Sequence, residues 1–391
     1  MSLTKNIIEV TIERIVPRGY GIAHGDGKTI FVALAAPGDR VRAEIVETKG
    51  SIAFAEIVQV LEPGPQRINP PCPYFGTCGG CDFQQMSYAE QLASKVEIIR
   101  DCLRRIGKIE FDNEIGVIGS PKELQYRSRA QWHLDTSSKG IGYYKRNSRE
   151  LVEIDRCPKL VPPLNEALAK LKSELAWENI WADQAFIDAA VGDENVVSLN
   201  SPGVFDPEDI SFTAFGEKFA YSAGVFFQGN QYLVPQLLET ALAGAEGRSA
   251  LDLYCGVGLF SLPMARKFAK VIGVEENPAS VAFAKKNAWA NGHENTEFRA
   301  ESVRRFLDGA KVKNVDFILL DPPRAGTEKD TMQNLIRIGA PSISYVACEP
   351  SMLARDLRRF DAEGYRIDSI TAVDLFPQTH HVETVARLSK R

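Results

Sequence analysis

The chain has 391 residues, of which 44% are apolar and 25% are charged. This composition is typical of a soluble globular protein and excludes a collagen-like or disordered chain, and the length predicts two or three domains. The net charge of −5 argues against binding nucleic acid through bulk charge alone. Because neither a signal peptide nor an apolar run of membrane-spanning length is visible, we expect a cytoplasmic protein without a membrane partner.

Residues 1–64 read as a series of short strands. Runs that are β-branched or that alternate between apolar and polar residues occur at 7–12, 29–32 and 41–46, and a Pro-Gly-Pro sequence at 63–65 ends the pattern. Four or five such strands predict a small closed β-barrel of the oligonucleotide-binding type. An SH3-like adaptor barrel without a nucleic-acid ligand fits the same pattern.

Residues 65–222 predict a central α+β domain. Ser87, followed three residues later by Glu90, forms a capping box that should start a helix. The apolar stripe expected on this helix consists of Leu92, Val96, Ile99, Leu103 and Ile106. Mixed strands and one further helix at 165–175 should complete the domain.

Within this central domain, residues 122–149 form a basic stretch with seven cations and two acids. Four aromatic residues are interleaved with the charges: Tyr126, Trp132, Tyr143 and Tyr144. Rings among cations suit unpaired bases and phosphates, so the stretch predicts a surface that faces RNA. A solvated antiparallel sheet explains the same residues without RNA.

Residues 223–391 alternate between apolar strands and helices. Strands are expected at 250–254, 271–274, 315–320 and 343–347, and a helix capped by Asn277 at 278–290. This alternation predicts an α/β domain with a doubly wound, Rossmann-like parallel sheet. Ligands of such sheets bind at the carboxyl ends of the strands, so the motifs that follow these strands form the candidate site.

The first motif is a glycine-rich loop at 252–258, directly after a strand. Glycines let the backbone approach a ligand, and Glu275 at the end of the next strand can accept hydrogen bonds from both hydroxyls of a ribose. A pyrophosphate fingerprint would require glycine where this chain has Ser261. The pattern therefore favours S-adenosylmethionine over NAD. A glycine-rich turn without a ligand is the plainer alternative.

Three further motifs follow later strands. Asp321 and Arg324 frame a Pro-Pro loop, Cys348 follows the next apolar strand, and Glu383 precedes the last one. A thiol at this edge is a candidate nucleophile and a carboxylate a candidate general base, although most lone cysteines are small buried hydrophobes. His380 and His381 lie near Glu383, and we expect no metal there because no partner ligand is evident.

Cysteines provide a separate motif in the central domain. Cys72, Cys78 and Cys81 fall within ten residues that also contain three glycines, and Cys157 lies further along the chain. Four thiolates suit either an iron–sulfur cluster or a structural zinc ion. The odd total of seven cysteines argues against a disulfide framework.

Taken in order, these motifs resemble the RNA uracil-5-methyltransferases over nearly the whole chain. The resemblance is carried by the four cysteines, Phe-Phe-Gln-Gly-Asn at 226–230, the glycine loop, Asp-Pro-Pro-Arg-Ala-Gly at 321–326, the segment 348–356 and the terminal His-x-Glu. It implies a TRAM barrel at the N-terminus and RNA as partner. It also implies a 4Fe–4S cluster on Cys72, Cys78, Cys81 and Cys157, and S-adenosylmethionine bound by Gln228, Tyr254, Glu275 and Asp321. Cys348 would attack uracil to form a covalent intermediate, and Glu383 would act as the base.

The resemblance favours 23S ribosomal RNA over transfer RNA as substrate, because the transfer-RNA enzymes of the family usually lack both barrel and cluster. No obligate protein partner is inferred. Alternatives are a cytosine-5 RNA methyltransferase, methylation of a transfer-RNA uridine, and a non-catalytic iron–sulfur RNA-binding factor. An NAD oxidoreductase is disfavoured by Ser261. The chain departs from the family pattern at Glu349 and Leu259, where the family often has asparagine.

Overall fold

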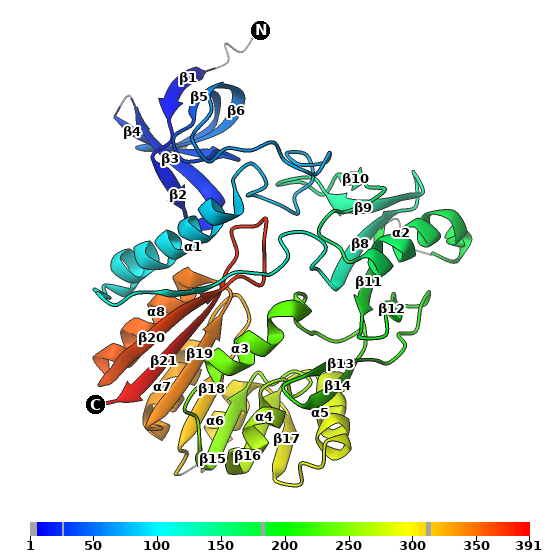
Figure 1. Ribbon diagram of the computed structural model, residues 1–391, viewed down its shortest axis with the longest axis vertical. Coiled ribbons are helices and arrows are strands. Elements are labelled where there is room, and N and C mark those ends of the chain that lie inside the picture. The colour runs from blue at the N-terminus through cyan, green and yellow to red at the C-terminus, as the bar shows by residue number, and fades with distance from the viewer. Residues whose placement is uncertain (1–5, 26, 181–183, 310–313) are drawn as a thin grey trace.

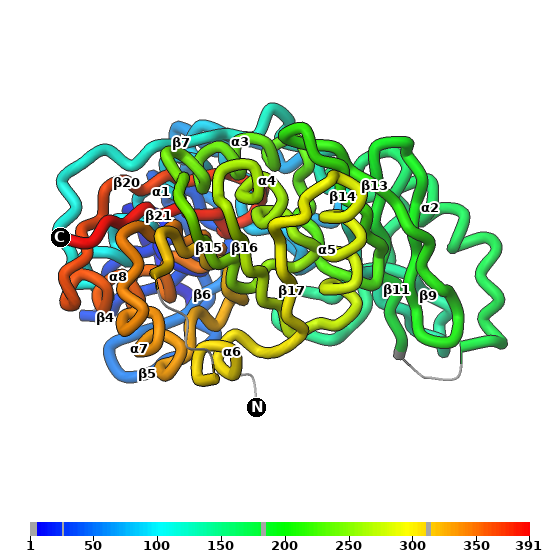
Figure 2. Tube along the Cα trace, turned by 90° about the horizontal axis from the view of Figure 1, so that it is seen from below, coloured from blue at the N-terminus to red at the C-terminus, as the bar shows by residue number. Residues whose placement is uncertain are grey.

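The protein is described from a computed structural model, which covers residues 6–25, 27–180, 184–309 and 314–391. Within these residues the strands form sheets of six, five, two and eight strands. In Figure 1 the six-stranded sheet lies at the top, the five-stranded sheet at the right and the eight-stranded sheet at the bottom. Figure 2 shows the five-stranded sheet and α2 (Pro162–Glu174) at the opposite end of the molecule from α7 (Lys329–Ile338) and α8 (Pro350–Ala362).

The six-stranded sheet has the strand order β1-β5-β6-β4-β3-β2. Its strands are β1 (Ile7–Thr11), β2 (Arg14–Val16), β3 (Tyr20–Gly25), β4 (Lys28–Ala33), β5 (Arg40–Lys49) and β6 (Ile52–Glu62). The sheet curls around a small apolar core that includes Ile30, Val32, Ala53 and Ala55. The sequence predicted four or five of these strands and missed the three-residue strand β2, which is too short to show an alternating pattern.

Helix α1 (Tyr88–Cys102) begins at the predicted capping box, where Ser87 Oγ accepts a hydrogen bond from the backbone N–H of Glu90 at 3.3 Å. The helix continues into a π-helical turn, η2 (Leu103–Gly107). A π turn inserts an extra residue into the helical repeat and rotates the side chains that follow. The predicted apolar stripe is therefore wrong at its end, because Ile106 is 40% exposed.

The five-stranded antiparallel sheet has the order β10-β9-β8-β11-β12. Its strands are β8 (Arg129–Asp135), β9 (Gly140–Tyr144), β10 (Leu151–Glu153), β11 (Gln184–Val191) and β12 (Val197–Asn200). Helix α2 packs on this sheet through Leu164, Leu168 and Leu171. The helix expected at 165–175 is confirmed, although it starts three residues earlier because a proline fits the first helical turn.

The eight-stranded sheet has the order β17-β16-β15-β18-β19-β21-β20-β7. Its strands are β7 (Gly116–Ile118), β15 (Gly247–Leu253), β16 (Phe268–Glu275), β17 (Thr296–Ala300), β18 (Phe317–Leu320), β19 (Ser342–Ala347), β20 (Tyr365–Val373) and β21 (Glu383–Lys390). The strands from β17 to β19 are parallel, as predicted. β21 runs antiparallel between β19 and β20, so the prediction of a wholly parallel sheet is wrong at this end. β20 and β21 are joined by a loop, and only antiparallel neighbours can be joined without a crossover.

Helices cover both faces of the eight-stranded sheet and complete a three-layer fold. One face packs against α3 (Val234–Ala241), α4 (Ser261–Ala265) and α5 (Pro278–Ala290), and the other against α1, α6 (Val303–Gly309), α7 and α8. The hairpin of β13 (Ile210–Ala214) and β14 (Glu217–Tyr221) joins the first face. The helix predicted at 278–290 is confirmed, and Asn277 Oδ1 accepts a hydrogen bond from the N–H of Ala279 at 2.9 Å.

Strand β7 belongs to a segment that precedes residue 222, yet it pairs in parallel with β20 of the eight-stranded sheet. Cys102 of α1 and Leu103 of η2 pack in the same apolar core as α8. The division of the chain at residues 64 and 222 stays a prediction. Among the described residues, no helix has both the length and the apolar character needed to cross a membrane.

Candidate functional site

Three neighbouring parallel strands, β16, β15 and β18, end side by side at the candidate cofactor site. Glu275 is the last residue of β16, Tyr254 follows β15, and Asp321 follows β18. The backbone N–H of Tyr254 donates to the carbonyl of Val274 at 2.9 Å, and that of Asp321 donates to the carbonyl of Leu253 at 3.3 Å. The fold thus brings three of the four predicted cofactor residues to one edge of the sheet.

Backbone N–H groups on two sides fix the Glu275 carboxylate. Its Oε1 accepts from Asn277 at 2.8 Å and its Oε2 accepts from Gly256 at 3.2 Å. Each carboxylate oxygen has a further lone pair for a ligand hydroxyl. The glycine loop leaves room for such a ligand, because a Cβ at Gly256 would meet no atom within 4 Å. Tyr254, at the start of this loop, has a φ of +68°, and strain of this kind in a non-glycine residue is common at functional sites.

Two recessed carboxyl groups lie beneath the glycine loop. Asp252 is fully buried, and its Oδ2 accepts a hydrogen bond from Ser261 Oγ at 2.5 Å, whereas Oδ1 has no partner among the described residues. Burial raises the pKa of Asp252 to about 7, and burial together with the Asp252 charge raises the pKa of Asp321 to about 7. An unpaired buried oxygen and two carboxyls that ionise reluctantly fit a ligand with positive charge, such as the sulfonium of S-adenosylmethionine.

The fourth predicted cofactor residue, Gln228, lies on the segment that leads into η4 (Gln231–Leu233) and is 4% exposed. Its neighbour Phe227 packs in the same apolar core as Val257 of the glycine loop. In the described part of the chain, no hydrogen bond joins Gln228 to the other three residues. Leu259, a departure from the family pattern, is also buried in this apolar core.

Cys348 and Glu383 lie at the same end of two neighbouring strands. β19 ends at Ala347, which pairs with Thr384 in the antiparallel register of β21. Cys348 and Glu383 directly adjoin this pair, and the Glu383 charge acts on the Cys348 thiol. The ladder register thus brings the predicted nucleophile and the predicted base together.

The surroundings of this pair make ionisation of both groups less favourable than in water. Burial, followed by the Glu383 charge, raises the pKa of the Cys348 thiol to about 12, while Arg324 acts in the opposite direction through its charge and a hydrogen bond. Burial and the Asp321 charge raise the pKa of Glu383 well above its usual value, and Arg324 again opposes the shift. Arg324 therefore favours the ionised form of both groups. Nothing in the sequence pattern indicated this role.

A buried hydrogen-bond network holds the loop that carries Arg324. Asp356 of α8 accepts from the backbone N–H of Thr327 at 3.1 Å and from the Tyr345 hydroxyl at 2.9 Å. Arg355 pairs with Asp356 at 2.8 Å and also donates to the carbonyl of Thr327 at 2.9 Å. Asp356 therefore fixes the far end of the Pro-Pro loop against α8.

Glu349, the other departure from the family pattern, is the N-cap of α8. Its Oε1 accepts hydrogen bonds from the backbone N–H of Ser351 at 3.4 Å and from the Ser351 hydroxyl at 2.7 Å. An acidic cap is favourable at a helix N-terminus. The residue that follows Cys348 is thus engaged in starting the next helix.

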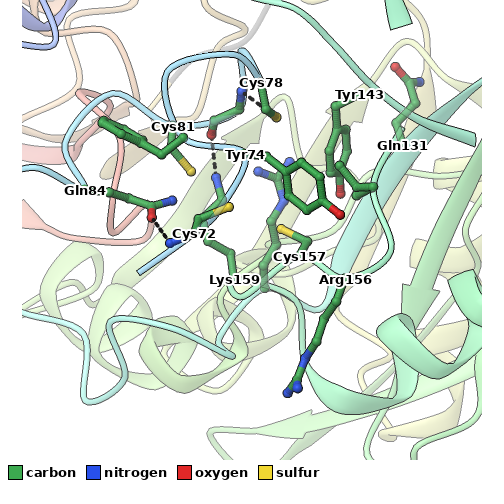
Figure 3. A pocket seen from close by; sticks show the side chains of 14 residues that line it. Cys72, Tyr74, Cys78, Cys81, Gln84, Gln131, Tyr143, Arg156, Cys157 and Lys159 are labelled. Carbon is green, nitrogen blue, oxygen red and sulfur yellow. Dashed lines mark hydrogen bonds between the residues drawn. The ribbon is translucent and has the colours of Figure 1, made fainter. Parts of the chain in front are cut away.

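Four of the seven free cysteines line one cavity of about 230 Å³. Cys72, Cys78, Cys81 and Cys157 surround this space in Figure 3, and the guanidinium of Arg156 is directed away from it. The structure therefore brings the predicted ligand set together, although Cys157 is 76 residues from Cys81 in sequence. Within the described ranges, no group of three or more His, Cys, Asp or Glu side chains has a geometry that would hold a metal ion.

Burial raises the pKa of the Cys72 and Cys78 thiols, and the polar groups around the cavity partly oppose this shift. The backbone N–H of Gly80 points at Cys78 Sγ at 3.4 Å. Arg127 and Lys159 also line the space, and their charges favour ionised sulfur. Hydrogen bonds to sulfur and nearby cations are the features that tune iron–sulfur clusters. The four sulfur atoms and these polar groups therefore share one cavity.

The cysteine loop is joined directly to the loop that precedes Glu383. Asp82 and Phe83 donate backbone N–H bonds to the carbonyl of Gln378 at 3.0 and 3.1 Å. Asp82 also accepts from Arg146 at 2.8 Å and contacts His380 Nδ1 at 2.7 Å. His380 thus has a carboxylate partner that the sequence did not indicate.

The basic stretch at 122–149 only partly matches its prediction. Trp132 and Tyr126 are buried, so these two rings cannot stack on RNA, and the prediction is wrong for them. Tyr143 and Tyr144 are half-buried, and Tyr144 stacks on His133 with ring centroids 3.7 Å apart. Trp132 is on the inward face of β8, whereas Tyr126 precedes that strand and its hydroxyl donates to the carbonyl of Pro377 at 2.8 Å.

The three-layer fold, the glycine loop and the recessed carboxyls define an S-adenosylmethionine-dependent methyltransferase. Comparison with known proteins agrees. Residues 211–391 match the family model described as tRNA (Uracil-5-)-methyltransferase, and residues 4–58 match the TRAM domain. A 23S rRNA (uracil(1939)-C(5))-methyltransferase RlmD of Shewanella amazonensis is 32% identical over an alignment that covers 97% of this chain and 95% of the relative. An uncharacterized RNA methyltransferase of Thermosynechococcus vestitus is 31% identical, with 98% of each chain covered.

Among solved structures, the chain is similar to Pyrococcus abyssi tRNA (uracil-54, C5)-methyltransferase in complex with S-adenosyl-L-homocysteine. The TM-score is 0.75 at 27% identity, and the match covers 97% of this chain and 100% of that one. The chain belongs to the RNA uracil-5-methyltransferases, which depend on S-adenosylmethionine. The resemblance inferred from the motifs is thus confirmed, as is the TRAM domain at the N-terminus.

Proposed function

We propose that this protein methylates carbon 5 of a uridine in 23S ribosomal RNA through a covalent Cys348–uracil intermediate. The proposal is supported by the antiparallel register of β19 and β21, whose last pair, Ala347 and Thr384, directly adjoins Cys348 and Glu383. The reaction requires a nucleophile and a base on a single bound pyrimidine, and this pair supplies both.

Carbon 5 of uracil is a poor nucleophile until a group adds to carbon 6. The Cys348 thiolate forms a bond to carbon 6, and the electron pair of the double bond moves into an enolate. S-adenosylmethionine would supply the methyl group: carbon 5 forms a bond to the methyl carbon as the bond from that carbon to the positively charged sulfur breaks, and S-adenosylhomocysteine is the leaving group. Glu383 then accepts the proton from carbon 5, the bond from sulfur to carbon 6 breaks, and the thiolate is regenerated.

Arg324 and the recessed carboxyls complete this scheme. Arg324 favours ionised Cys348, so it promotes the attacking form of the sulfur. Glu383 is a stronger base than an exposed carboxylate because its pKa is raised. We assign the ribose to Glu275 and the positive sulfur to the surroundings of Asp321, with Tyr254 and Gln228 as further cofactor contacts. The target base must leave its stack to reach this site.

We also propose that Cys72, Cys78, Cys81 and Cys157 hold a 4Fe–4S cluster. The proposal is supported by the shared cavity of about 230 Å³ that all four cysteines line. Protein purified without oxygen should contain iron and absorb broadly in the visible range, as thiolate-ligated iron does. Stoichiometric zinc without iron would contradict the proposal. The matched control is Cys102→Ser, because Cys102 is buried outside the cavity.

The test of the main proposal separates nucleophile from base. Cys348→Ala should abolish methylation of uridine in RNA and any protein–RNA adduct on a denaturing gel. Glu383→Gln should slow proton removal by about 10²–10⁴-fold, so that the adduct accumulates. Full turnover by Glu383→Gln without adduct would make Glu349 the next candidate base. Methylation of cytidine in place of uridine would favour the cytosine-5 alternative.

The choice of 23S ribosomal RNA is supported by RlmD relatives whose alignments cover nearly the whole chain. Uridine in transfer RNA is a second candidate, because the Pyrococcus abyssi enzyme matches the chain over 97% of its length. The presence of a barrel therefore does not separate the two substrates, contrary to the argument from sequence. Mapping 5-methyluridine in both RNAs from a deletion strain would decide between them.

A further inference from the structure

A cleft of about 1000 Å³ separates the barrel from the end of α1 and leads toward the start of α8. Strands β2, β3, β4 and β6 form one wall, and the π-helical turn η2 forms the other. Glu349 and Ser351, beside Cys348, also line the cleft. Figure 1 shows the barrel next to α1 on the side of the molecule where α8 lies. The cleft therefore connects the outer surface of the barrel with the neighbourhood of the proposed nucleophile.

Three aromatic rings form a platform on the barrel wall. Phe31 and Phe54 pair in register on β4 and β6, and their rings stack with centroids 5.4 Å apart and an interplanar angle of 26°. Tyr20 of β3 meets Phe54 edge-on at 5.8 Å. The neighbours of Phe31, Ile30 and Val32, point into the barrel core, so the three rings lie on the outer face. The core does not require them, yet they line the cleft.

The opposite wall is cationic. Arg104 and Arg105 lie on η2, and their side chains are 58% and 61% exposed. Beside them, the π turn exposes Ile106, whose place in the predicted stripe would have been buried. On the barrel side, Arg18 is held at a φ of +69° and is exposed, and it forms no ion pair within the described residues.

Three acids also line the cleft, but each is engaged. Asp101 accepts from Arg14 at 2.5 Å and from Arg104 at 2.9 Å, and Arg105 lies 3.8 Å from it, so three arginines surround this one carboxylate. Glu13 contacts His24 Nδ1 at 2.7 Å, and Glu349 caps α8. Cations and apolar rings are therefore what the cleft offers to a ligand. This combination matches single-stranded nucleic acid, in which bases stack on rings and phosphates contact arginines.

We propose that this cleft binds the unpaired RNA segment next to the target uridine. Bases stack on Tyr20, Phe31 and Phe54, and phosphates contact Arg104 and Arg105. The cleft reaches the upper limit of ordinary small-molecule pockets, about 1,000 Å³, and so has room for more than one nucleotide. Because it ends at Glu349, a strand bound in it delivers the adjoining base to Cys348. The inference rests on the proposed function and adds the path of the substrate.

The first test is crosslinking, in full-length Cys348→Ala protein so that catalysis plays no part. An RNA of about ten nucleotides carries one central uridine and, in its flank, 5-iodouridine, which crosslinks to aromatic side chains on irradiation. We expect crosslinked peptides that contain Tyr20, Phe31 or Phe54. Crosslinks confined to the basic stretch at 122–149 would overturn the proposal. The ligand of the cleft would then be a protein rather than RNA.

The second test is affinity, measured by fluorescence anisotropy with the same RNA. Phe54→Ala should weaken binding roughly 5- to 100-fold, as expected for the loss of one stacked base, and Phe54→Trp should retain it. Val58→Ala is the matched control, since Val58 is exposed on the same strand and does not line the cleft. If Phe54→Ala bound the RNA as tightly as the unmodified protein, the proposal that bases stack on these rings would be wrong.

The arginine wall is tested through salt dependence, in a variant that does not touch the barrel core. Arg104→Gln combined with Arg105→Gln should reduce the slope of log affinity against log salt by about 0.7 for each phosphate that the variant no longer neutralises. Arg100→Gln, an exposed position on the same helix outside the cleft, is the control. An unchanged slope would remove Arg104 and Arg105 from the proposal. If RNA bound tightly in the cleft but no RNA were methylated, the proposed function would be wrong while the proposed RNA-binding cleft would stand.

Discussion

Asp82 and His380 are 298 residues apart in sequence and are joined by a hydrogen bond of 2.7 Å. Burial opposes ionisation of Asp82, but His380 and Arg146 hold its pKa well below the usual range. The carboxylate is therefore ionised and can only accept, so His380 Nδ1 carries the proton. Since Asp82 follows Cys81 and His380 precedes Glu383 by three residues, this bond ties the cysteine loop to the segment that positions the proposed base.

Loss of this tie should impair catalysis more than cofactor binding. Asp82→Asn removes a charge-assisted bond, and misplacement of a catalytic group can cost about 10²-fold in rate. We expect a lower single-turnover methylation rate with an unchanged dissociation constant for S-adenosylmethionine. Asp155→Asn, at an exposed carboxylate paired with Lys172, is the control. Iron content must be measured in parallel, because Asp82 adjoins a proposed cluster ligand. A normal methylation rate in Asp82→Asn would show that this bond does not position the proposed base.

The methylation rate should depend on pH through the ionisation of the Cys348 thiol. Because its pKa in the free protein is raised to about 12, the thiolate fraction grows with pH across the whole accessible range. We expect kcat/KM to rise about tenfold per pH unit between about pH 6 and pH 9, without a plateau. A plateau below pH 8 would mean that the thiol is already acidified in the free protein.

Arg324→Gln should raise the thiol pKa further and slow adduct formation at saturating RNA, about tenfold or more at each pH, because a charge-assisted interaction with the thiolate is removed. Arg324→Lys should restore part of the rate, since the charge is kept. Arg366→Gln is a suitable control, because Arg366 is exposed on β20 and pairs with Asp368. Equal adduct rates in Arg324→Gln and the unmodified protein would exclude this role.

Cofactor binding should release protons. Asp252 and Asp321 have pKa values raised to about 7, so both are partly protonated near neutral pH. A positive sulfur favours their ionised forms and lowers their pKa values, so affinity for S-adenosylmethionine should increase from about pH 6 to pH 8. S-adenosylhomocysteine lacks this charge and should show a weaker trend. Calorimetry in two buffers of different ionisation enthalpy measures the protons. Identical behaviour of the two ligands would argue against a sulfonium near Asp321.

Glu275→Ala should weaken S-adenosylmethionine binding about 10- to 100-fold, the equivalent of about 1.5–3 kcal/mol for charge-assisted hydrogen bonds. Glu275→Gln keeps an acceptor for the N–H groups of Gly256 and Asn277, so it separates loss of the ribose contact from loosening of the loop. Glu276→Ala, at the exposed neighbour, is the control. If only Glu276→Ala reduced affinity in calorimetry, the assignment of the ribose to Glu275 would be wrong.

Much of the fold was predictable because local signals were strong. The capping box at Ser87, the cap at Asn277 and the apolar strands at 317–320 and 342–347 all have patterns that depend on neighbours in sequence. The antiparallel insertion of β21 between β19 and β20 was not predictable, because strand order depends on contacts between distant residues. The π turn at 103–107 was missed for a similar reason, since its sequence continues an ordinary helical pattern.

The candidate site likewise contains residues that the sequence predicted and residues that only the folded structure revealed. Cys348 and Glu275 were found because each directly ends or follows a recognisable strand. The effect of Arg324 on the thiol, the support from Asp356 and the bond between Asp82 and His380 require the folded loops. Arg324 in particular was noticed in sequence only as a residue that frames the Pro-Pro loop. Groups that act through electrostatic contact leave little trace in sequence spacing.

The central position of β21 in its sheet has a consequence for protein synthesis. A ribosome makes β19 and β20 before β21, so the nascent chain exposes two unpaired strand edges until β21 arrives between them. β7 emerges earlier still, since each of its residues precedes its partner in β20 by 255 positions. Newly made chains should therefore depend on chaperones late in translation, and premature termination before β21 should give an aggregation-prone product rather than a partly active one.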